Sequence, residues 1–155
     1  MSCIFCEILA GKVSASFVYR DNQVAAFMDI QPINTGHILI VPVVHAAGLE
    51  ELSGPDGAAM FATAQRLSRA LRTSGLRCEG VNLMLANGEA AGQEVFHVHL
   101  HAIPRFKNDG FGHKFPESYS QRPPRTALEE AATAIRESLK RLPNESAPPV
   151  RLTGG

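Results

Sequence analysis

The sequence predicts an α+β domain with a five-stranded, mostly antiparallel sheet and two main helices. Three observations support this class. Short runs rich in β-branched and aromatic residues, bounded by turn residues, occur at 16–20, 23–29, 37–41, 80–86 and 95–103. Two longer segments, 55–74 and 126–142, repeat apolar residues at helical spacing. The connections between neighbouring strands are short, which favours antiparallel pairing.

The N-terminal elements each have a local reason. Residues 3–10 are expected to form a short helix that ends at Gly11, because glycine suits the left-handed position after a helix. The turn Asp21-Asn22 separates the first two strands, and Pro42 ends the third.

The two long helices are predicted from their apolar stripes. The first stripe comprises Met60, Phe61, Ala64, Leu67 and Leu71, with Gly75 as the cap. The second comprises Leu128, Ala132, Ile135, Leu139 and Leu142. Thr126 and Glu129 fit a capping box at the start of the second helix.

Length and composition favour one globular domain. The chain has 155 residues, of which 45% are hydrophobic and 19% charged, which is a folded protein's balance. We expect a single domain over residues 1–142. From Pro143 the composition shifts to PNESAPPVRLTGG, which predicts a flexible C-terminal tail over 143–155.

Charge and hydropathy exclude two classes of partner. Lys plus Arg and Asp plus Glu both number 15, so the basic excess of a nucleic-acid binder is missing. No apolar run approaches the roughly 18 residues of a membrane span. The N-terminal segment carries Glu7 and lacks the basic region with which a signal peptide begins. We expect the three cysteines to be reduced thiols. We therefore expect a cytoplasmic protein without a membrane partner.

The densest chemistry lies in FHVHLHAIPR, where His97, His99 and His101 alternate with aliphatic residues. Alternate residues of a strand share a face, so the three imidazoles are expected on one face. One interpretation is a row of solvated histidines. A second is a three-histidine catalytic zinc site, although successive positions on a flat strand do not converge easily on one ion. The third, which we favour, is nucleophilic catalysis by one imidazole whose other nitrogen donates to a backbone carbonyl.

A glycine-rich loop, NGEAAGQE, leads into the histidines. Glycine permits close backbone approach to an anion, and Asn87 and Gln93 can donate hydrogen bonds to phosphate oxygens. The loop and the histidines together therefore indicate a site for phosphoryl chemistry.

The run GQEVFHVHLHAIPR resembles the signature of the histidine triad (HIT) family of nucleotidyl hydrolases and transferases. Further similar segments are CIFCEI, AFMDIQPINTGHILIVPVVH, NGEAAGQ and DGFG at 109–112, all in the family's order. The resemblance covers roughly residues 3–142 and is nearest to bacterial Hit-like proteins of the Hint branch.

The resemblance implies a role for each polar residue of the motifs. His99 matches the nucleophile that forms a covalent nucleotidyl-histidine, and His101 matches the histidine that contacts the phosphate oxygens. Asn87 and Gln93 match polar groups near the phosphate, where donors stabilise developing charge. His37 matches a supporting histidine on the neighbouring strand; the alternative is an ordinary histidine at a strand end.

The resemblance also implies a nucleoside pocket. Asp29 matches the carboxylate that holds the ribose hydroxyls, or is an ordinary turn residue. The residues that match the apolar slot for the base are Ile4, Phe5, Ile8, Phe27, Met28 and Ile30, and their alternative role is core packing. Glu94 departs from the Ser or Thr of many relatives. A glutamate there repels phosphate when ionised, and acts as a catalytic acid only if burial raises its pKa.

Cys3 and Cys6 have a zinc-type spacing and face the same side of a short helix. The resemblance implies a structural Zn²⁺ whose other two ligands are His45 and His97. The alternatives are a redox pair, which lacks the thioredoxin-type context, and two cysteines without a metal.

The leading hypothesis is a hydrolase that acts on nucleoside 5′-monophosphate derivatives such as phosphoramidates and adenylates. The alternatives are a purine nucleotide-binding or interaction module with little turnover, a dinucleoside polyphosphate hydrolase, and a metal-dependent hydrolase without a covalent intermediate. The resemblance also implies a homodimer.

Overall fold

The computed structural model describes residues 3–112 and 114–143. The chain divides into two compact units, Met1–Phe111 and Gly112–Gly155. The single domain expected over 1–142 stays a prediction, and the expected tail lies, after Pro143, outside the described residues. Within the described ranges no helix has the length and apolar character to cross a membrane. The cytoplasmic location stays a prediction.

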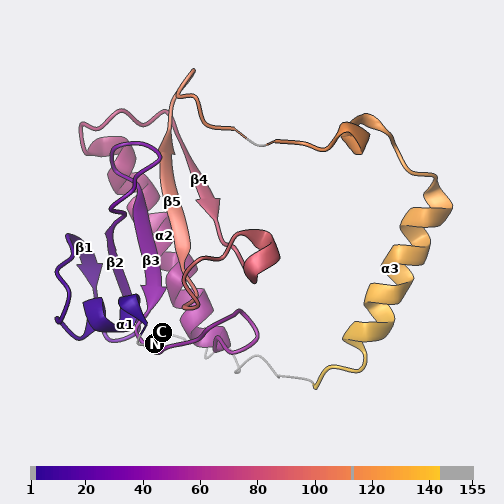
Figure 1. Cartoon of the computed structure of the whole chain (residues 1–155), viewed down its shortest axis with the longest axis horizontal. Helices are drawn as coiled ribbons and strands as arrows, with labels where there is room; N and C mark the ends of the chain where they lie inside the picture. Colours follow the sequence, from indigo (N-terminus) through magenta and orange to yellow (C-terminus); the bar gives the residue numbers. More distant parts are fainter. Residues whose placement is uncertain (1–2, 113, 144–155) are drawn as a thin grey trace, which may run out of the picture. The chain divides into compact units, whose positions relative to one another are not determined.

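The first unit is the predicted α+β fold, a five-stranded antiparallel sheet with helices (Figure 1). Its elements are α1 (Ile4–Leu9), β1 (Phe17–Arg20), β2 (Val24–Met28), β3 (Ile38–Pro42), α2 (Gly54–Thr73), β4 (Gly80–Met84), η1 (Glu89–Ala91) and β5 (Leu100–Arg105). The strand order is β1-β2-β3-β5-β4, and every neighbouring pair is antiparallel. β5 is the last strand along the chain, but in the sheet it lies between β3 and β4.

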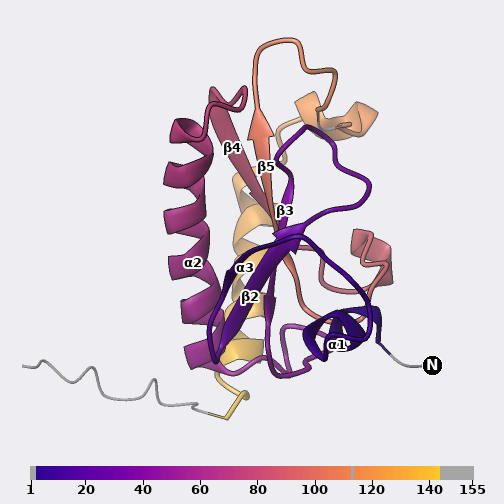
Figure 2. The same cartoon turned by 90° about the vertical axis from the view of Figure 1, so that its left-hand side faces the viewer.

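Helices cover both faces of the central strands, with α2 on one side and α1 on the other (Figure 2). The α2 side holds Val24, Ala26, Ile38 and Ile40 with Met60, Ala64, Leu67 and Leu71. The α1 side holds Ala25, Phe27, Leu39 and Val41 with Phe5, Ile8 and Leu9. Because side chains of a strand alternate between faces, this double cover explains why β2 and β3 are apolar throughout.

The ends of α2 follow the predicted helix closely. Ser53 caps its first turn by accepting a hydrogen bond from the backbone N–H of Asp56 at 3.2 Å. Gly75, just beyond its end, adopts the left-handed φ of +83°. Phe61, expected on the apolar stripe, is 55% exposed, so it lies outside the buried face.

The strand predicted over 95–103 is wrong at both ends, since β5 spans Leu100–Arg105. Residues 95–97 form a bend and 98–99 lie outside the strand. Their backbone bonds elsewhere: the N–H of Val98 donates to the carbonyl of Ala46 at 2.7 Å and that of His97 to the carbonyl of Val95 at 2.9 Å. Only His101 of the three histidines lies in the strand. The expected alternation of sides is confirmed, however: Val98 and Ala102 lie in the core on the α2 side, whereas the rings of His97 and His99 contact Phe5 of α1.

The described part of the second unit contains η2 (Glu117–Ser120) and α3 (Arg125–Leu139). The capping box predicted at Thr126 is wrong, because the N-cap is Pro124 and makes no side-chain bond. Glu129 instead accepts a hydrogen bond from Arg136 at 2.6 Å. The apolar stripe of this helix is exposed, at 47% for Leu128 and 62% for Ile135.

Candidate functional site

A cavity of about 510 Å³ opens on the α1 side of the sheet. Its apolar wall comes from α1 and β2, and its polar wall from the loop after β2 and from the segment that leads into β5. The predicted site residues that line it are Ile4, Phe5, Ile8, Phe27, Met28, Asp29, Ile30, His37, Glu94, His99 and His101. The fold thus gathers most of the residues expected to bind base, ribose and phosphate into one pocket.

The pocket also contains residues that sequence reasoning missed. They are Val13, Ser14, Ala15, Gln31, Ile33, Leu39, Gly92 and Val95. Leu39 could have been found from strand pairing, because it is the register partner of both Phe27 and His101 and shares their face. The loop residues 13–15 carry no such periodic signal.

The ring of His99 is buried in the pocket wall and has one defined tautomer. Its Nδ1 lies 2.7 Å from the backbone carbonyl of His97 and donates to it, because a carbonyl oxygen only accepts. A neutral imidazole with a protonated Nδ1 carries its lone pair on Nε2. The edge contact of this ring with Phe5, 5.3 Å between centroids, holds it further in place.

His37 and His101 form a hydrogen-bonded pair beside His99. The N–H of Ile33 donates to Nδ1 of His37 at 3.2 Å, so the proton of His37 is on Nε2. That Nε2 lies 2.9 Å from Nδ1 of His101 and donates to it, which leaves the proton of His101 on Nε2. His101 thus offers an N–H donor, whereas His99 offers a lone pair.

Burial keeps this pair uncharged. Burial lowers the pKa of His37, and the nearby Asp29 only partly opposes it. Burial, with smaller effects of His99 and His37, lowers the pKa of His101 to about 4. Oδ2 of Asp29 is 3.6 Å from Nδ1 of His37, too far for a hydrogen bond. Nδ1 of His37 accepts a hydrogen bond from Ile33 and so carries no proton. The contact between His37 and Asp29 is therefore not an ion pair.

Asn87 and Gln93 do not line the pocket, and both side chains bond within the protein. Asn87 accepts from the N–H of Leu49 at 2.9 Å and donates to Glu50 at 3.0 Å. Gln93 is buried; it donates to the carbonyl of Ala47 at 2.7 Å and accepts from Gly88 at 2.8 Å. Both amides shape the loop in this structure, and their contact with phosphate stays a prediction.

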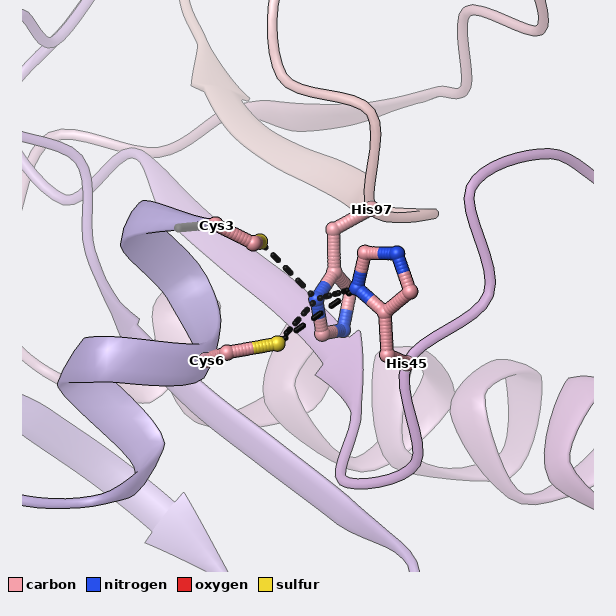
Figure 3. Close-up of side chains that lie close together, drawn as sticks. All are labelled: Cys3, Cys6, His45 and His97. Atoms are coloured by element: carbon pink, nitrogen blue, oxygen red, sulfur yellow. Dashed lines mark hydrogen bonds between the residues drawn. The ribbon is translucent and has the colours of Figure 1, made fainter. Parts of the chain in front are cut away.

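The second predicted cluster is also assembled. Cys3 and Cys6 project from α1 toward His45, which follows β3, and His97, which precedes β5 (Figure 3). One ligand atom of each lies within 4.8 Å of the others. Nδ1 of His97 is 3.4 Å from Sγ of Cys3, 3.6 Å from Sγ of Cys6 and 3.3 Å from Nδ1 of His45.

These separations fit one tetrahedral ion. Zinc bonds of about 2.3 Å to sulfur and 2.0–2.1 Å to nitrogen give tetrahedral edges of roughly 3.6 Å for S–N and roughly 3.3 Å for N–N. His97 has the matching tautomer, since its Nε2 donates to the carbonyl of Pro42 at 2.9 Å and Nδ1 keeps its lone pair. The residues therefore form a site that can hold zinc.

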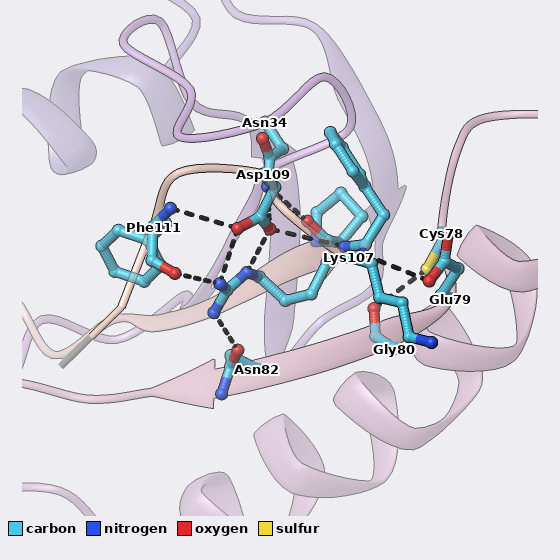
Figure 4. A network of polar contacts seen from close by, with 11 residues as sticks. Asn34, Cys78, Glu79, Gly80, Asn82, Lys107, Asp109 and Phe111 are labelled. Carbon is cyan, nitrogen blue, oxygen red and sulfur yellow. Dashed lines mark hydrogen bonds and ion pairs between the residues drawn. The ribbon is translucent and has the colours of Figure 1, made fainter.

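A third polar network lies at the far end of β5 and contacts the pocket loop (Figure 4). Asp109 accepts two hydrogen bonds from Arg105, at 2.6 and 2.8 Å, and one from Asn34 at 2.9 Å. Arg105 holds the pKa of Asp109 well below its usual range. Asn34 belongs to the loop between β2 and β3, and its carbonyl accepts from the N–H of His37 at 3.0 Å.

A buried, carbonyl-oriented imidazole beside an apolar pocket on an antiparallel sheet defines a histidine-based site for a small ligand. The family model described as the HIT domain matches residues 10–108, so the chain belongs to the HIT family. "Protein hit" of Bacillus subtilis is 41% identical over 112 residues, which are 72% of this chain and 77% of that protein. "Adenylylsulfatase HINT3" of Arabidopsis thaliana is 36% identical over 107 residues, 69% of this chain and 54% of that protein.

Solved structures agree with this assignment. A HIT family protein from Bacillus anthracis superposes with a TM-score of 0.80 at 38% identity, over 88% of this chain and 96% of that one. A zinc-bound histidine triad family protein from Mycobacterium smegmatis gives 0.69 at 37% identity, over 90% and 98%. A histidine triad nucleotide-binding protein from Candida albicans gives 0.79 at 29% identity, over 90% and 98%.

Proposed function

We propose that this protein is a nucleotidyl hydrolase or transferase that cleaves nucleoside 5′-monophosphate derivatives, phosphoramidates and adenylates, through a covalent nucleotidyl-histidine on His99. The observation that carries the proposal is the 2.7 Å bond from Nδ1 of His99 to the His97 carbonyl, which leaves Nε2 as the basic nitrogen. The names of HINT3, an adenylylsulfatase, and of the nucleotide-binding protein from Candida albicans support the substrate class.

The pocket residues suggest how an AMP derivative binds. The base lies against the apolar wall of Phe5, Ile8 and Phe27, and Asp29 accepts hydrogen bonds from the ribose hydroxyls. The phosphate then faces His99 and His101. The Nε2–H of His101 donates to a phosphate oxygen and stabilises the charge that develops there.

The reaction proceeds in two displacements. Nε2 of His99 attacks the α-phosphorus, and the bond from phosphorus to the leaving group breaks with its electron pair. The leaving group takes up one proton from water at the open end of the pocket. Water then attacks phosphorus, the bond to Nε2 breaks, and one proton returns to solvent, so that the sum is hydrolysis to AMP.

The experiment measures release of AMP from adenosine 5′-phosphoramidate by the wild type and by His99→Ala. We expect the variant to lose activity by on the order of 10⁴ or more, because nothing else replaces the nucleophile. Calorimetric AMP binding by the variant controls for folding. Denaturation of the wild type during turnover at alkaline pH, where a phosphorus–nitrogen bond to histidine survives, should show one adenylyl group on the protein by mass spectrometry. Equal turnover by the two proteins would overturn the proposal.

The second candidate is a purine nucleotide-binding module with little turnover. The side-chain amides of Asn87 and Gln93 donate to groups of the protein itself. Fewer N–H donors are therefore available to stabilise a reacting phosphate, which favours a binding module with little turnover. Nucleotide binding without turnover by the wild type would establish this alternative in the experiment above.

We further propose that Cys3, Cys6, His45 and His97 bind a structural Zn²⁺. The donor set, the tetrahedral separations and the zinc-bound relative from Mycobacterium smegmatis support it. A closed four-ligand zinc site is structural and leaves no position for substrate. Its effect on the reaction is indirect: it orients His97, whose carbonyl accepts from His99.

We also propose a homodimer. The exposed stripe on α3, with Leu128, Ile135 and Leu139 each at least 47% exposed, is an apolar surface that a second copy can cover. A mass of one chain by light scattering would overturn this proposal.

A further inference from the structure

One charged residue of the pocket, Glu94, has no role in the mechanism above. Among the described residues that line the pocket, Asp29 and Glu94 carry carboxylates and none is Lys or Arg. Burial of the paired histidines, His37 and His101, keeps them neutral at pH 7. The pocket therefore offers hydrogen-bond donors to a substituted phosphate that carries one negative charge. It offers no cationic side chain to a ligand that carries further negative charges.

The two carboxylates lie on different walls. Asp29 follows β2, beside the apolar base wall, and its Oδ1 accepts from the N–H of Gln31 at 2.8 Å. Glu94 belongs to the segment that runs from η1 into His99, and it is exposed. The buried Gln93 fixes that segment by donating to the carbonyls of Ala47 at 2.7 Å and Val95 at 3.1 Å. Glu94 is thus held at the mouth of the pocket, on the wall that leads to the nucleophile.

We propose that Glu94 selects the leaving group by charge: it favours phosphoramidates whose amine carries an additional ammonium group and disfavours anionic leaving groups such as polyphosphate and sulfate. This inference rests on the proposed function and names its substrate class. An exposed pair of opposite charges contributes up to about a fivefold preference, and a like pair an opposite effect of similar size. The ratio between a cationic and an anionic substrate combines both effects and reaches at most about 25-fold.

The chemistry is the same for each substrate. The bond between phosphorus and Nε2 of His99 forms while the bond between phosphorus and the amine nitrogen breaks. The amine nitrogen keeps the electron pair and takes up one proton from water. The distant ammonium group takes no part in bond making; it only pairs with Glu94 as the amine leaves through the mouth.

The experiment compares kcat/KM for three AMP conjugates linked through nitrogen. Their amines are ethylenediamine, which keeps a free ammonium, ethanolamine, which is neutral, and β-alanine, which carries a carboxylate. We expect the wild type to prefer the ethylenediamine conjugate over the β-alanine conjugate. Glu94→Gln should reduce that ratio about tenfold, Glu94→Lys should invert the order, and added salt should weaken the wild-type ratio.

Glu89→Gln is the matched control, because Glu89 is an exposed carboxylate on the same loop that does not line the pocket. It should keep the wild-type ratio. The ratio of two substrates within one protein cancels any general loss of activity from a variant. Comparing that ratio between the wild type and a variant cancels the different intrinsic reactivities of the amines.

The outcomes separate the two proposals. Turnover of all three conjugates with a ratio that Glu94→Gln and Glu94→Lys leave unchanged overturns the role of Glu94 and keeps the hydrolase. A ratio that Glu94→Gln shifts toward the ethylenediamine conjugate also overturns it. No turnover of any conjugate by the wild type overturns the proposed function and this inference with it.

Discussion

His99 and His101 line the same pocket with opposite hydrogen-bonding roles, and contacts with backbone groups determine these roles. The His97 carbonyl makes Nδ1 of His99 a donor, at 2.7 Å. The N–H of Ile33 makes Nδ1 of His37 an acceptor, and His37 in turn assigns the proton of His101. A ring nitrogen with a lone pair and a ring N–H donor therefore belong to two histidines that line the same pocket.

At the scale of one residue, His101 predicts a pH dependence of stability. In the unfolded chain its pKa is about 6.5, whereas burial lowers it to about 4 in the fold. Between these values the unfolded state binds more protons, so the stability it contributes is complete above pH 6.5 and is lost as the pH falls toward 4. We expect His101→Asn, which keeps a hydrogen-bonding side chain, to reduce the slope of unfolding free energy against pH over this window.

Urea unfolding of both proteins from pH 4 to 7 measures the slopes. Other groups contribute to the absolute slope, so the difference between the two proteins is the quantity to compare. Parallel curves would show that His101 titrates alike in the folded and unfolded states.

At the scale of elements, the loop between β2 and β3 is held from outside the pocket. Nδ2 of Asn34 donates to the carbonyl of Pro104 and to Asp109, both at 2.9 Å. Gly36 closes the same loop with a φ of +98°, and a Cβ there would meet Leu76 at 2.9 Å. The DGFG motif, whose Asp109 makes the contact, thereby positions the loop that places Ile33 and His37 in the pocket wall.

We expect Asn34→Ala to weaken AMP binding and raise KM more than it lowers kcat, because the loop wall loosens while His99 keeps its carbonyl partner. Two lost hydrogen bonds should cost about 1–2 kcal/mol of unfolding free energy. Calorimetry with AMP and steady-state kinetics provide the measurement.

Glu79→Gln is the control for this prediction. Glu79 accepts from the N–H of Lys107 at 3.2 Å at the same end of β5, without contact to the pocket loop. It should leave AMP affinity unchanged. Equal loss of affinity in both variants would mean that general stability, and not the loop, explains the effect.

At the scale of the whole first unit, the cysteine–histidine cluster connects three segments that are distant in sequence. The N-terminal end of the chain at α1, the segment after β3 and the segment before β5 meet there. An ion that binds the folded state and not the unfolded state raises the free energy of unfolding by mass action. The increase is about 2.7 kcal/mol when the ion's concentration is 100 times its dissociation constant. The ion would thus attach α1, one wall of the pocket, to the segment of the nucleophile.

We expect removal of zinc by a chelator to lower Tm by about 5–10 °C, given roughly 2–4 °C per kcal/mol for a chain of this size. Differential scanning calorimetry with and without the chelator, together with metal analysis, measures this. Cys6→Ser should lose the metal and the chelator response.

Cys78→Ser serves as the matched cysteine variant. The thiol of Cys78 donates to the carbonyl of Gly80 at 3.2 Å and lies outside the cluster. It should keep both the metal and the chelator response. A purified wild type without zinc and with no chelator response would contradict the zinc proposal.

Much of the fold could be predicted because local patterns specify the elements. Apolar periodicity located α2, and β-branched runs located β2 and β3, within a residue or two. The start of β5 could not be found this way. The alternation FHVHLHAI reads as a strand throughout, but the backbone of Val98 bonds to Ala46, a partner that is 52 residues away in sequence.

The sequence by itself determined the sheet class, the HIT family, a large part of the pocket lining and the four members of the cysteine–histidine cluster, because these depend on residue type and spacing. Only the tertiary structure decided how those residues are used. The side chains of Gln93 and Asn87 form hydrogen bonds that hold the loop before the histidines. Hydrogen bonds to neighbouring groups also decide which ring nitrogen of each pocket histidine carries the proton. Those outcomes depend on which distant backbone groups come within hydrogen-bond distance, and no local pattern in the chain encodes that distance.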